Sequence, residues 1–190
     1  MGRLLHDDEG ADVTFDVKGE SFPAHRVILQ VRTPRAFHLV MLHYKYHATD
    51  DGGKSRILIH DMEPTVFEAV LRFIYTDRLQ LRQAMDELSK DGRVEMARGL
   101  LAAADRFNMG RFKLLCEQML SKSLEVENVA ATLVLADRYN CSGLKDYFID
   151  FMISSRMDDV ARTKGYTVLK DNHPCLLVEA LEKAGKLGKV

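Results

Sequence analysis

The sequence predicts an α+β fold, in which a small sheet and its first helices precede a wholly helical C-terminal half. Residues 13–17 alternate between apolar and polar side chains, which is the period of a half-buried strand. From Val94 onward the apolar residues recur at helical spacing, and two stretches of this half repeat one another. A chain of 190 residues has room for one domain with a helical extension.

The overall charge is close to neutral, with 27 Lys and Arg against 28 Asp and Glu. This balance disfavours a general nucleic-acid-binding surface, because binding phosphates needs a positive excess or patch. No apolar run approaches the ~20 residues that span a bilayer, so we expect no membrane segment. The cysteines, Cys116, Cys141 and Cys175, are odd in number and widely spaced, which is typical of a reduced protein of the cytoplasm or nucleus.

A hairpin and a helix are expected near the N-terminus. The strand at 13–17 is followed by a tight turn at 18–20 and a return strand that begins at Ser21. Pro23 is expected to open a helix that runs to Arg32, because its missing N–H is harmless in a first turn. The apolar stripe predicted for this helix consists of Val27, Ile28 and Val31.

Two further helices and a short strand are expected next. Pro34 begins a helix with an apolar face that recurs through Tyr44, and a strand at 57–59 follows a polar loop at 50–55. The helix that starts at Pro64 is apolar on much of its circumference, which predicts a central position. Asp61 and Glu63 are rival N-caps for it. Its expected core residues are Val66, Phe67, Val70, Leu71, Phe73 and Ile74.

An internal repeat organises the helical half. Residues 104–108 recur 32 positions later as residues 136–140, and the apolar stripe that follows recurs at the same displacement. Each copy is therefore expected to be a helix, a sharp turn near Asn and a second helix. A break at 172–174 precedes a last helix at 175–183. The aromatic residues interpreted as core are Phe107, Phe112, Tyr139, Tyr147, Phe148 and Phe151.

No enzymatic or metal-binding motif is complete in the sequence. His43 and His47 have an i, i+4 spacing that can bind zinc, but no Cys or carboxylate completes a known ligand pattern. Cys116 is expected in the core and Cys141 at an exposed helix turn, neither with a partner for nucleophilic catalysis. The stretch 51–55 ends like a phosphate-binding loop but lacks the first glycine of that motif. We therefore expect no catalytic residue, no metal and no cofactor.

Several segments, taken together and in order, resemble a BTB/POZ domain. Its opening is matched by residues 12–15, 22–29 and 32–34, and its continuation by residues 62–67, 73–77, 100–107 and 115–117. Residues 126–137 and the later His173-Pro174 pair resemble the helical region that follows the BTB domain in the MATH-BTB family, the family of speckle-type POZ protein and its plant relatives.

This resemblance implies a domain organisation and a function. The BTB/POZ fold, a small sheet flanked by helices, is expected over residues 1–122, and a helical 3-box or partial BACK-like region over residues 123–190. Members of this family are non-catalytic adaptors that dimerise and link a cullin-3-type ubiquitin-ligase scaffold to substrate proteins. The alternative is a BTB dimerisation or transcriptional co-regulator module without ligase activity. Neither role involves nucleic acid or a membrane directly.

The resemblance also assigns residues to surfaces. Leu4, Leu5, Asp12, Arg26 and Ile28 match the dimer face of the family, with Asp12 and Arg26 as a charged pair in the dimer groove. His25 matches a position that we interpret as a structural hydrogen-bonding histidine.

Two departures from the family pattern concern its partners. No MATH domain precedes the Asp12 strand in this sequence, because Met1 lies only a few residues ahead of it; the sequence is either a shortened part of a longer protein or a member of the family without that domain. The cullin-contacting loop usually carries a hydrophobic residue, any residue and then Glu. Here the matching segment is Tyr44-Lys45-Tyr46, which is the candidate cullin contact. An aromatic in place of that carboxylate removes a charged hydrogen bond worth about 1.5–3 kcal/mol.

Overall fold

The computed structural model describes residues 10–34, 38, 49–51, 54–79, 87–154 and 157–187. The chain divides into two compact units, residues 1–116 and residues 117–190, each described below by itself. The elements that begin in the first unit are β1 (Val13–Val17), β2 (Glu20–Ala24), α1 (Arg26–Arg32), β3 (Thr49–Asp51), β4 (Lys54–Ile59), α3 (Pro64–Thr76), α5 (Lys90–Arg106) and α6 (Gly110–Lys122). The second unit contains α7 (Val126–Arg138), α8 (Ser142–Ile153), α9 (Met157–Ala161), α10 (Lys164–Asn172) and α11 (Pro174–Leu187). Among the described residues, no helix has the length and apolar character needed to cross a membrane.

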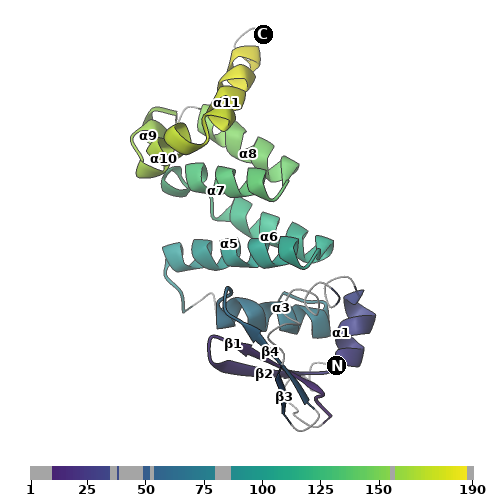
Figure 1. Cartoon of the computed structure of the whole chain (residues 1–190). Coiled ribbons are helices and arrows are strands. Elements are labelled where there is room, and N and C mark those ends of the chain that lie inside the picture. Colours follow the sequence, from purple (N-terminus) through teal and green to yellow (C-terminus); the bar gives the residue numbers. More distant parts are fainter. Residues whose placement is uncertain are drawn as a thin grey trace. The chain divides into compact units, whose positions relative to one another are not determined.

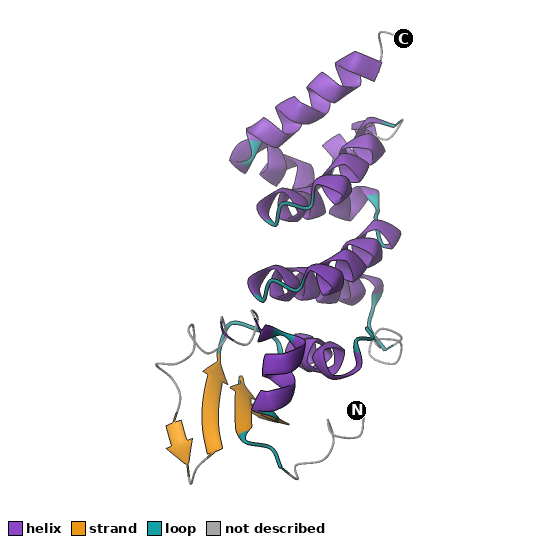
Figure 2. Ribbon diagram, turned by 90° about the vertical axis from the view of Figure 1, so that its right-hand side faces the viewer, coloured by secondary structure: helices purple, strands orange, loops and turns teal. Residues whose placement is uncertain are grey.

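The strands form one sheet in the order β2-β1-β4-β3, with helices on one of its faces (Figures 1 and 2). The alternation predicted for the first strand is confirmed, because Val13, Phe15 and Val17 are buried in β1. β1 pairs antiparallel with β2 and parallel with β4, which places Phe15 opposite Ile57. The predicted tight turn is also present, since Lys18 and Gly19 both have positive φ angles, 52° and 91°.

The first helix starts later than predicted. Pro23 lies in β2 opposite Thr14, and α1 begins only at Arg26. A proline is tolerated in β2 because this strand is at the edge of the sheet. The predicted apolar stripe of α1 does not pack into the core: Leu29 is buried, whereas Val27 and Val31 are exposed.

Strands occupy much of the segment predicted as a polar loop. β3 pairs with β4 in antiparallel register, so that only residues 52–53 separate the two strands. β4 begins three residues before the predicted strand because this hairpin extends the pairing beyond the apolar positions. Of the helix predicted from Pro34 to Tyr44, the structure describes only Pro34 and His38, so most of that prediction lies outside the described residues.

Helix α3 is the centre of the first unit, as predicted. It starts at Pro64 with Glu63 as the N-cap, and all six predicted core residues are buried. The Phe67 ring packs against the rings of Phe15 and Phe22 of the sheet, at centroid distances of 5.0 and 5.4 Å. On its other side α3 packs against α5, so that it lies between the sheet and the helices that follow (Figure 1). Burial of this all-round apolar helix holds the unit together.

The repeated segments form matching turns. Asn108 after α5 and Asn140 after α7 both adopt left-handed φ angles, 50° and 52°. The N–H of Met109 donates to Ala104 and the N–H of Cys141 donates to Ala136, both at 2.8 Å. This is the pattern of a Schellman motif, in which the residue after the left-handed position reaches back across the last helical turn. The prediction of a sharp turn near each Asn is confirmed.

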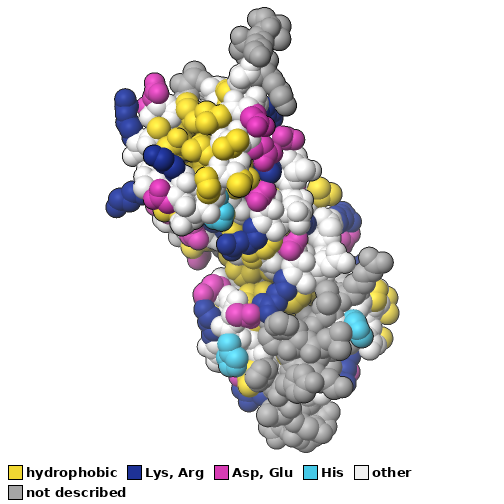
Figure 3. All heavy atoms as spheres, turned by 45° about the horizontal axis from the view of Figure 1, so that its top comes forward, with side chains coloured by type: hydrophobic (Ala, Val, Ile, Leu, Met, Phe, Trp, Pro, Cys, Tyr) yellow, Lys and Arg dark blue, Asp and Glu magenta, His cyan; other side chains and the backbone are white. Residues whose placement is uncertain are grey.

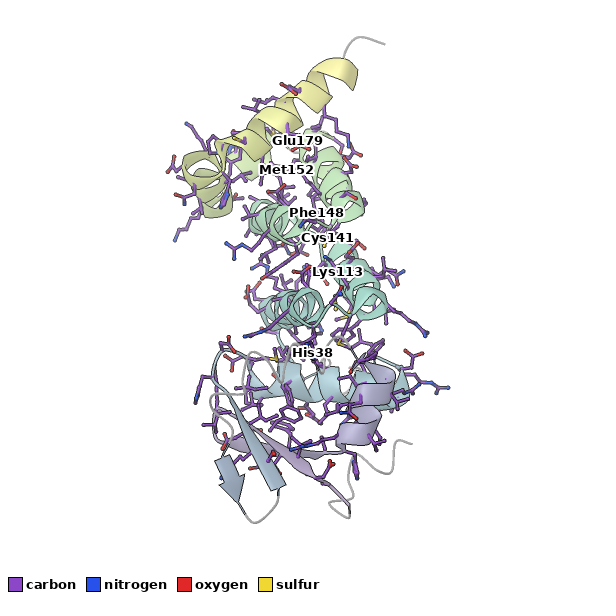
Figure 4. All side chains as sticks on the ribbon, turned by 45° about the vertical axis from the view of Figure 1, so that its right-hand side comes forward. His38, Lys113, Cys141, Phe148, Met152 and Glu179 are labelled. Carbon is purple, nitrogen blue, oxygen red and sulfur yellow. The ribbon has the colours of Figure 1, made fainter. Side chains whose placement is uncertain are left out.

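Several side chains of the second unit differ from the predictions, and Tyr139 and Phe151, both predicted as core, are only half-buried. Cys141 is buried, because it occupies the Schellman position that packs back onto the end of α7. Tyr147 is 49% exposed, because α8 buries the line formed by Leu144, Phe148 and Met152 instead. In Figure 4, Cys141 lies at the α7–α8 turn, with Phe148 and Met152 on α8. The last helix begins at Pro174, as the predicted break implies, and runs to Leu187.

Candidate interaction surfaces

The corner between β2 and α1 is held by Asp12. Its carboxylate accepts the backbone N–H of Arg26 at 2.8 Å, and its own N–H donates to the Ala24 carbonyl at 3.2 Å. Because the N-cap residue His25 provides no side-chain cap, Asp12 satisfies an N–H of the first turn of α1 from outside the helix. The predicted partners are therefore adjacent, but through a carboxylate–amide hydrogen bond.

The Arg26 guanidinium points to the sheet rather than to Asp12. It donates to the Ser55 hydroxyl on β4, and its Nε atom is buried without a hydrogen-bond partner among the described residues. The prediction of a charged Asp12–Arg26 pair is thus corrected to two separate contacts at one corner. Both residues hold the first turn of α1 in position. These contacts therefore help to determine which face of α1 points outward.

Tyr75 of α3 forms hydrogen bonds to the same corner. The Tyr75 hydroxyl accepts the backbone N–H of His25 at 2.9 Å and exchanges a second hydrogen bond with the His25 Nδ1 atom, also at 2.9 Å. Burial raises the pKa of the Tyr75 hydroxyl, so the group stays neutral and retains its proton. The interpretation of His25 as a structural hydrogen-bonding residue agrees with these contacts.

The outer face of α1 is apolar and exposed. Val27 and Val31 lie one helical turn apart and are 62% and 75% exposed, whereas Ile28 is half-buried. Adjacent exposed apolar side chains can form part of a contact surface. The sequence predicts both valines as part of the apolar stripe of this helix, but a period of 3.6 identifies a stripe and not the direction in which it faces. Leu4 and Leu5 lie outside the described residues.

A hollow of about 310 Å³ lies where the ends of α1 and α3 meet the α5–α6 turn. Its apolar lining includes Phe73 and Phe112, whose rings pack at a centroid distance of 4.7 Å. The charged part of its lining includes Arg32, which donates to the Tyr75 carbonyl at 3.2 Å, and Arg111, which forms an ion pair with Asp77. The hollow can therefore accept an apolar side chain beside an acidic one. This hollow could not be predicted from the sequence, because its lining comes from three separate segments.

Other predicted site residues are accounted for as follows. Tyr44, Lys45 and Tyr46, and also His43 and His47, lie outside the described residues. His38 and His60 are exposed. Within the described part of the chain, no group of three or more His, Cys, Asp or Glu side chains is arranged to hold a metal ion. Cys116 is buried in the core as predicted.

Known protein families match both the N-terminal and the C-terminal part of the chain. The family description "BTB/POZ domain" matches residues 1–124, and "BPM/SPOP, BACK domain" matches residues 128–181. Similar curated proteins include BTB/POZ and MATH domain-containing protein 3 of Arabidopsis thaliana, 35% identical over 98% of this chain and 45% of its own length. Protein 4 of the same series is 37% identical over 96% of this chain and 39% of its own length.

The chain thus spans less than half the length of the curated relatives it matches. Among solved structures, the BTB domain of zebrafish PATZ1 is 24% identical, with a TM-score of 0.43, over 64% of this chain and 91% of that one. The BTB match covers well over half of the residues and coincides with the sheet, α1 and α3 described above. The chain belongs to the BTB/POZ domain family, and its BTB domain is followed by a BACK domain of the BPM/SPOP type.

Proposed function

We propose that this protein is a non-catalytic adaptor of a cullin-3-type ubiquitin ligase. The observation that carries the proposal is the order of a BTB domain and a BPM/SPOP-type BACK domain in one chain, shared with relatives named as BTB/POZ and MATH domain-containing proteins. Residues 1–122 act as the scaffold-binding and dimerising domain, and residues 123–190 as its helical extension. An adaptor forms no bonds itself; it raises the effective concentration of one bound partner near another.

The scaffold contact is assigned to the hollow and to the segment that follows it. Pro34 lines the hollow and leads toward Tyr44, Lys45 and Tyr46, the candidate contact segment. A scaffold helix with an exposed apolar side chain and a neighbouring carboxylate fits this lining, because Arg32 and Arg111 contribute positive charge there. Asp77 limits this charge by pairing with Arg111.

A binding titration with the N-terminal half of a cullin-3-type protein tests this assignment. Arg111 is 69% exposed, so Arg111→Glu changes the charge of the lining without removing buried side chains. We expect it to weaken binding about tenfold, since a charge reversal at a complementary contact costs about 1–2 kcal/mol. The control is Lys170→Glu, an equal charge change at an exposed residue of α10. Equal affinities of the two variants would contradict the proposed contact.

Dimerisation is assigned to the outer face of α1. The exposed pair Val27 and Val31 continues from the corner built by Asp12 and Arg26, the residues predicted for the dimer surface. Val27→Asp with Val31→Asp places two charges on this face and is expected to yield a monomer in light scattering at ~50 μM. Val168→Asp, at a valine that is 54% exposed on α10, is the matched control and should leave the mass unchanged. A dimer that survives the α1 changes would refute the assignment.

A second function is favoured by one sequence observation, the Tyr44-Lys45-Tyr46 segment in place of the usual hydrophobic-x-Glu pattern. Without scaffold affinity, the same dimer face would pair this chain with other BTB subunits and make it a co-regulator or a competitor of full-length adaptors. Native mass spectrometry of a mixture with a full-length MATH-BTB relative distinguishes the two. Heterodimers together with absent scaffold binding would favour this second function, whereas scaffold binding favours the adaptor.

A further inference from the structure

The last helix, α11, is held to the second unit by few apolar side chains. Among its described residues, only Leu176 and Ala180 are buried, at 5% and 1% exposure. Val178 and Leu181 face outward and are more than half exposed. Figure 3 shows hydrophobic side chains gathered on the surface of the C-terminal helices, with charged side chains around them. Leu177 and Ala184 are half-buried, so one leucine and one alanine are the fully buried apolar residues among those described, which is a small apolar contribution for a helix of this length.

Two lysines form ion pairs between α11 and the helix α8. Lys145 on α8 lies 2.7 Å from the Glu179 carboxylate of α11 and 2.8 Å from the Asp137 carboxylate of α7. Lys183 on α11 lies 2.9 Å from the Asp150 carboxylate and 3.3 Å from the Asp146 carboxylate, both on α8. Figure 4 shows Glu179 on α11, the helix that these contacts join to α8. One lysine on α8 and one lysine on α11 therefore both contribute ion pairs between these two helices.

Lys145 makes one contact that the first repeat also has, and a second one to Glu179 of α11. The first repeat has the equivalent pair, Lys113 with Asp105 at 2.6 Å, which closes the α5–α6 turn. In the second repeat the equivalent Lys145–Asp137 pair closes the α7–α8 turn, and the same ammonium group also holds Glu179. The side chains of Lys145 and Lys183 are 20% and 32% exposed, so both ammonium groups are partly shielded yet within reach of solvent.

We propose that α11 is a releasable element, held in place by a two-lysine clamp formed by Lys145 and Lys183. Loss of the two positive charges, whether by substitution or by acylation of the amines, detaches α11 while α7 and α8 remain folded. Release would uncover the surfaces of α8 and α10 against which α11 packs. Elements held by few buried apolar contacts are the ones that open locally, below the free energy of global unfolding. The proposal concerns only the second unit and does not depend on scaffold binding.

Hydrogen–deuterium exchange of the full chain tests the clamp. In the variant with Lys145→Gln and Lys183→Gln, amides of residues 174–187 should exchange about tenfold faster or more, while those of α7 and α8 are unchanged. Two controls separate charge from side-chain loss. The variant with Lys145→Arg and Lys183→Arg keeps both charges and should match the wild type. Lys170→Gln, at an exposed lysine of α10, removes a charge away from the clamp and should also match it.

A salt series on the wild type gives an independent measurement that needs no variant. Exchange in residues 174–187 should accelerate between about 0.05 and 0.5 M NaCl, because screening weakens partly exposed ion pairs. Unchanged exchange of α11 in the Gln variant would overturn the proposal, since the apolar contacts would then suffice. Loss of protection throughout α7, α8 and α11 together would overturn it as well, because α11 would not be a separate element.

Discussion

Each of the two units contains one copy of the same helical turn, and the two copies are used differently. At the α5–α6 turn, Met109 packs back onto its helix and Arg111 reaches across to Asp77 of α3. At the α7–α8 turn, Cys141 takes the place of Met109, and no arginine follows it. The first turn lines a hollow, and the second anchors α11 through Lys145.

Some features are common to both turns, and others occur in only one of them. The shared features are the left-handed Asn, the backbone bond behind it and the Lys–Asp pair, which together close a helical turn. The features that differ, Arg111 in one copy and the Glu179 contact in the other, join the turn to a neighbouring element. The two helical turns therefore share one structure, and the contacts to neighbouring elements differ between them. Substitutions can change the shared structure without changing those contacts.

The largest expected effect is in the core of the second copy. Phe148 is fully buried on α8, so Phe148→Ala should lower the free energy of unfolding by about 3–5 kcal/mol. Its neighbour Tyr147 is 49% exposed, and Tyr147→Ala should cost less than about 1 kcal/mol. Urea unfolding followed by circular dichroism provides both values. Similar losses at the two positions would show that the buried line of α8 is assigned wrongly.

The two turns should respond alike to changes at the asparagines. Asn108→Ala and Asn140→Ala remove the short polar side chain that makes the left-handed region tolerable for Asn, at a cost of about 1–2 kcal/mol each. Asn108→Gly and Asn140→Gly should be neutral or slightly stabilising, because glycine adopts these angles freely. Thermal unfolding of the four variants checks this. A loss in only one copy would mean that the two turns are not equivalent in energy.

Alkaline pH should weaken the second unit through its lysines. The hydrogen bonds that Lys145 donates to the Asp137 and Glu179 carboxylates raise its pKa above the ordinary value of 10.5, and the hydrogen bond that Lys183 donates to Asp150 does the same for Lys183. A raised pKa means that the stabilisation is complete below 10.5 and is lost as the pH rises through the higher value in the folded protein. At alkaline pH the midpoint of thermal unfolding should fall less in the variant with Lys145→Arg and Lys183→Arg than in the wild type, because arginine keeps its charge. Identical pH profiles would contradict this expectation.

Acid should have a smaller effect, located in the first unit. The Arg56 side chain, at 2.5 Å, and the Gly19 N–H, at 2.9 Å, lower the pKa of Asp16 below its ordinary value of 3.8. The stabilisation is therefore present above 3.8 and is lost as the pH falls through the lower value in the folded protein. The stability difference between the wild type and Asp16→Asn should shrink toward acid. A difference that is constant with pH would exclude an ionised Asp16 as its source.

The sequence predicted those features that depend on local periodicity. The alternation of β1, the apolar circumference of α3 and the paired turns at Asn108 and Asn140 each arise from a few adjacent residues. The start of α1 could not be predicted in this way, because Pro23 is compatible both with a first helical turn and with an edge strand. Only the position of β2 in the sheet decides between them.

The candidate surfaces were predicted less completely, for the same physical reason. The adjacency of Asp12 and Arg26 was expected, but the contact that joins them depends on where Ser55 of β4 lies. The outward direction of Val27 and Val31 depends on the side of α1 that packs against α3. The burial of Cys141 had a signal in the repeat, since its equivalent Met109 is apolar. No comparable signal existed for the hollow, whose lining residues are remote in the sequence.

The most direct test of the account is the mass of the full chain in solution, alone and with the N-terminal half of a cullin-3-type protein, measured by light scattering at ~50 μM. We expect a dimer that shifts to a complex of two chains with two scaffold fragments. A chain whose mass is unchanged by the scaffold fragment would contradict its assignment as a ligase adaptor, and a monomeric mass would contradict the use of the α1 face.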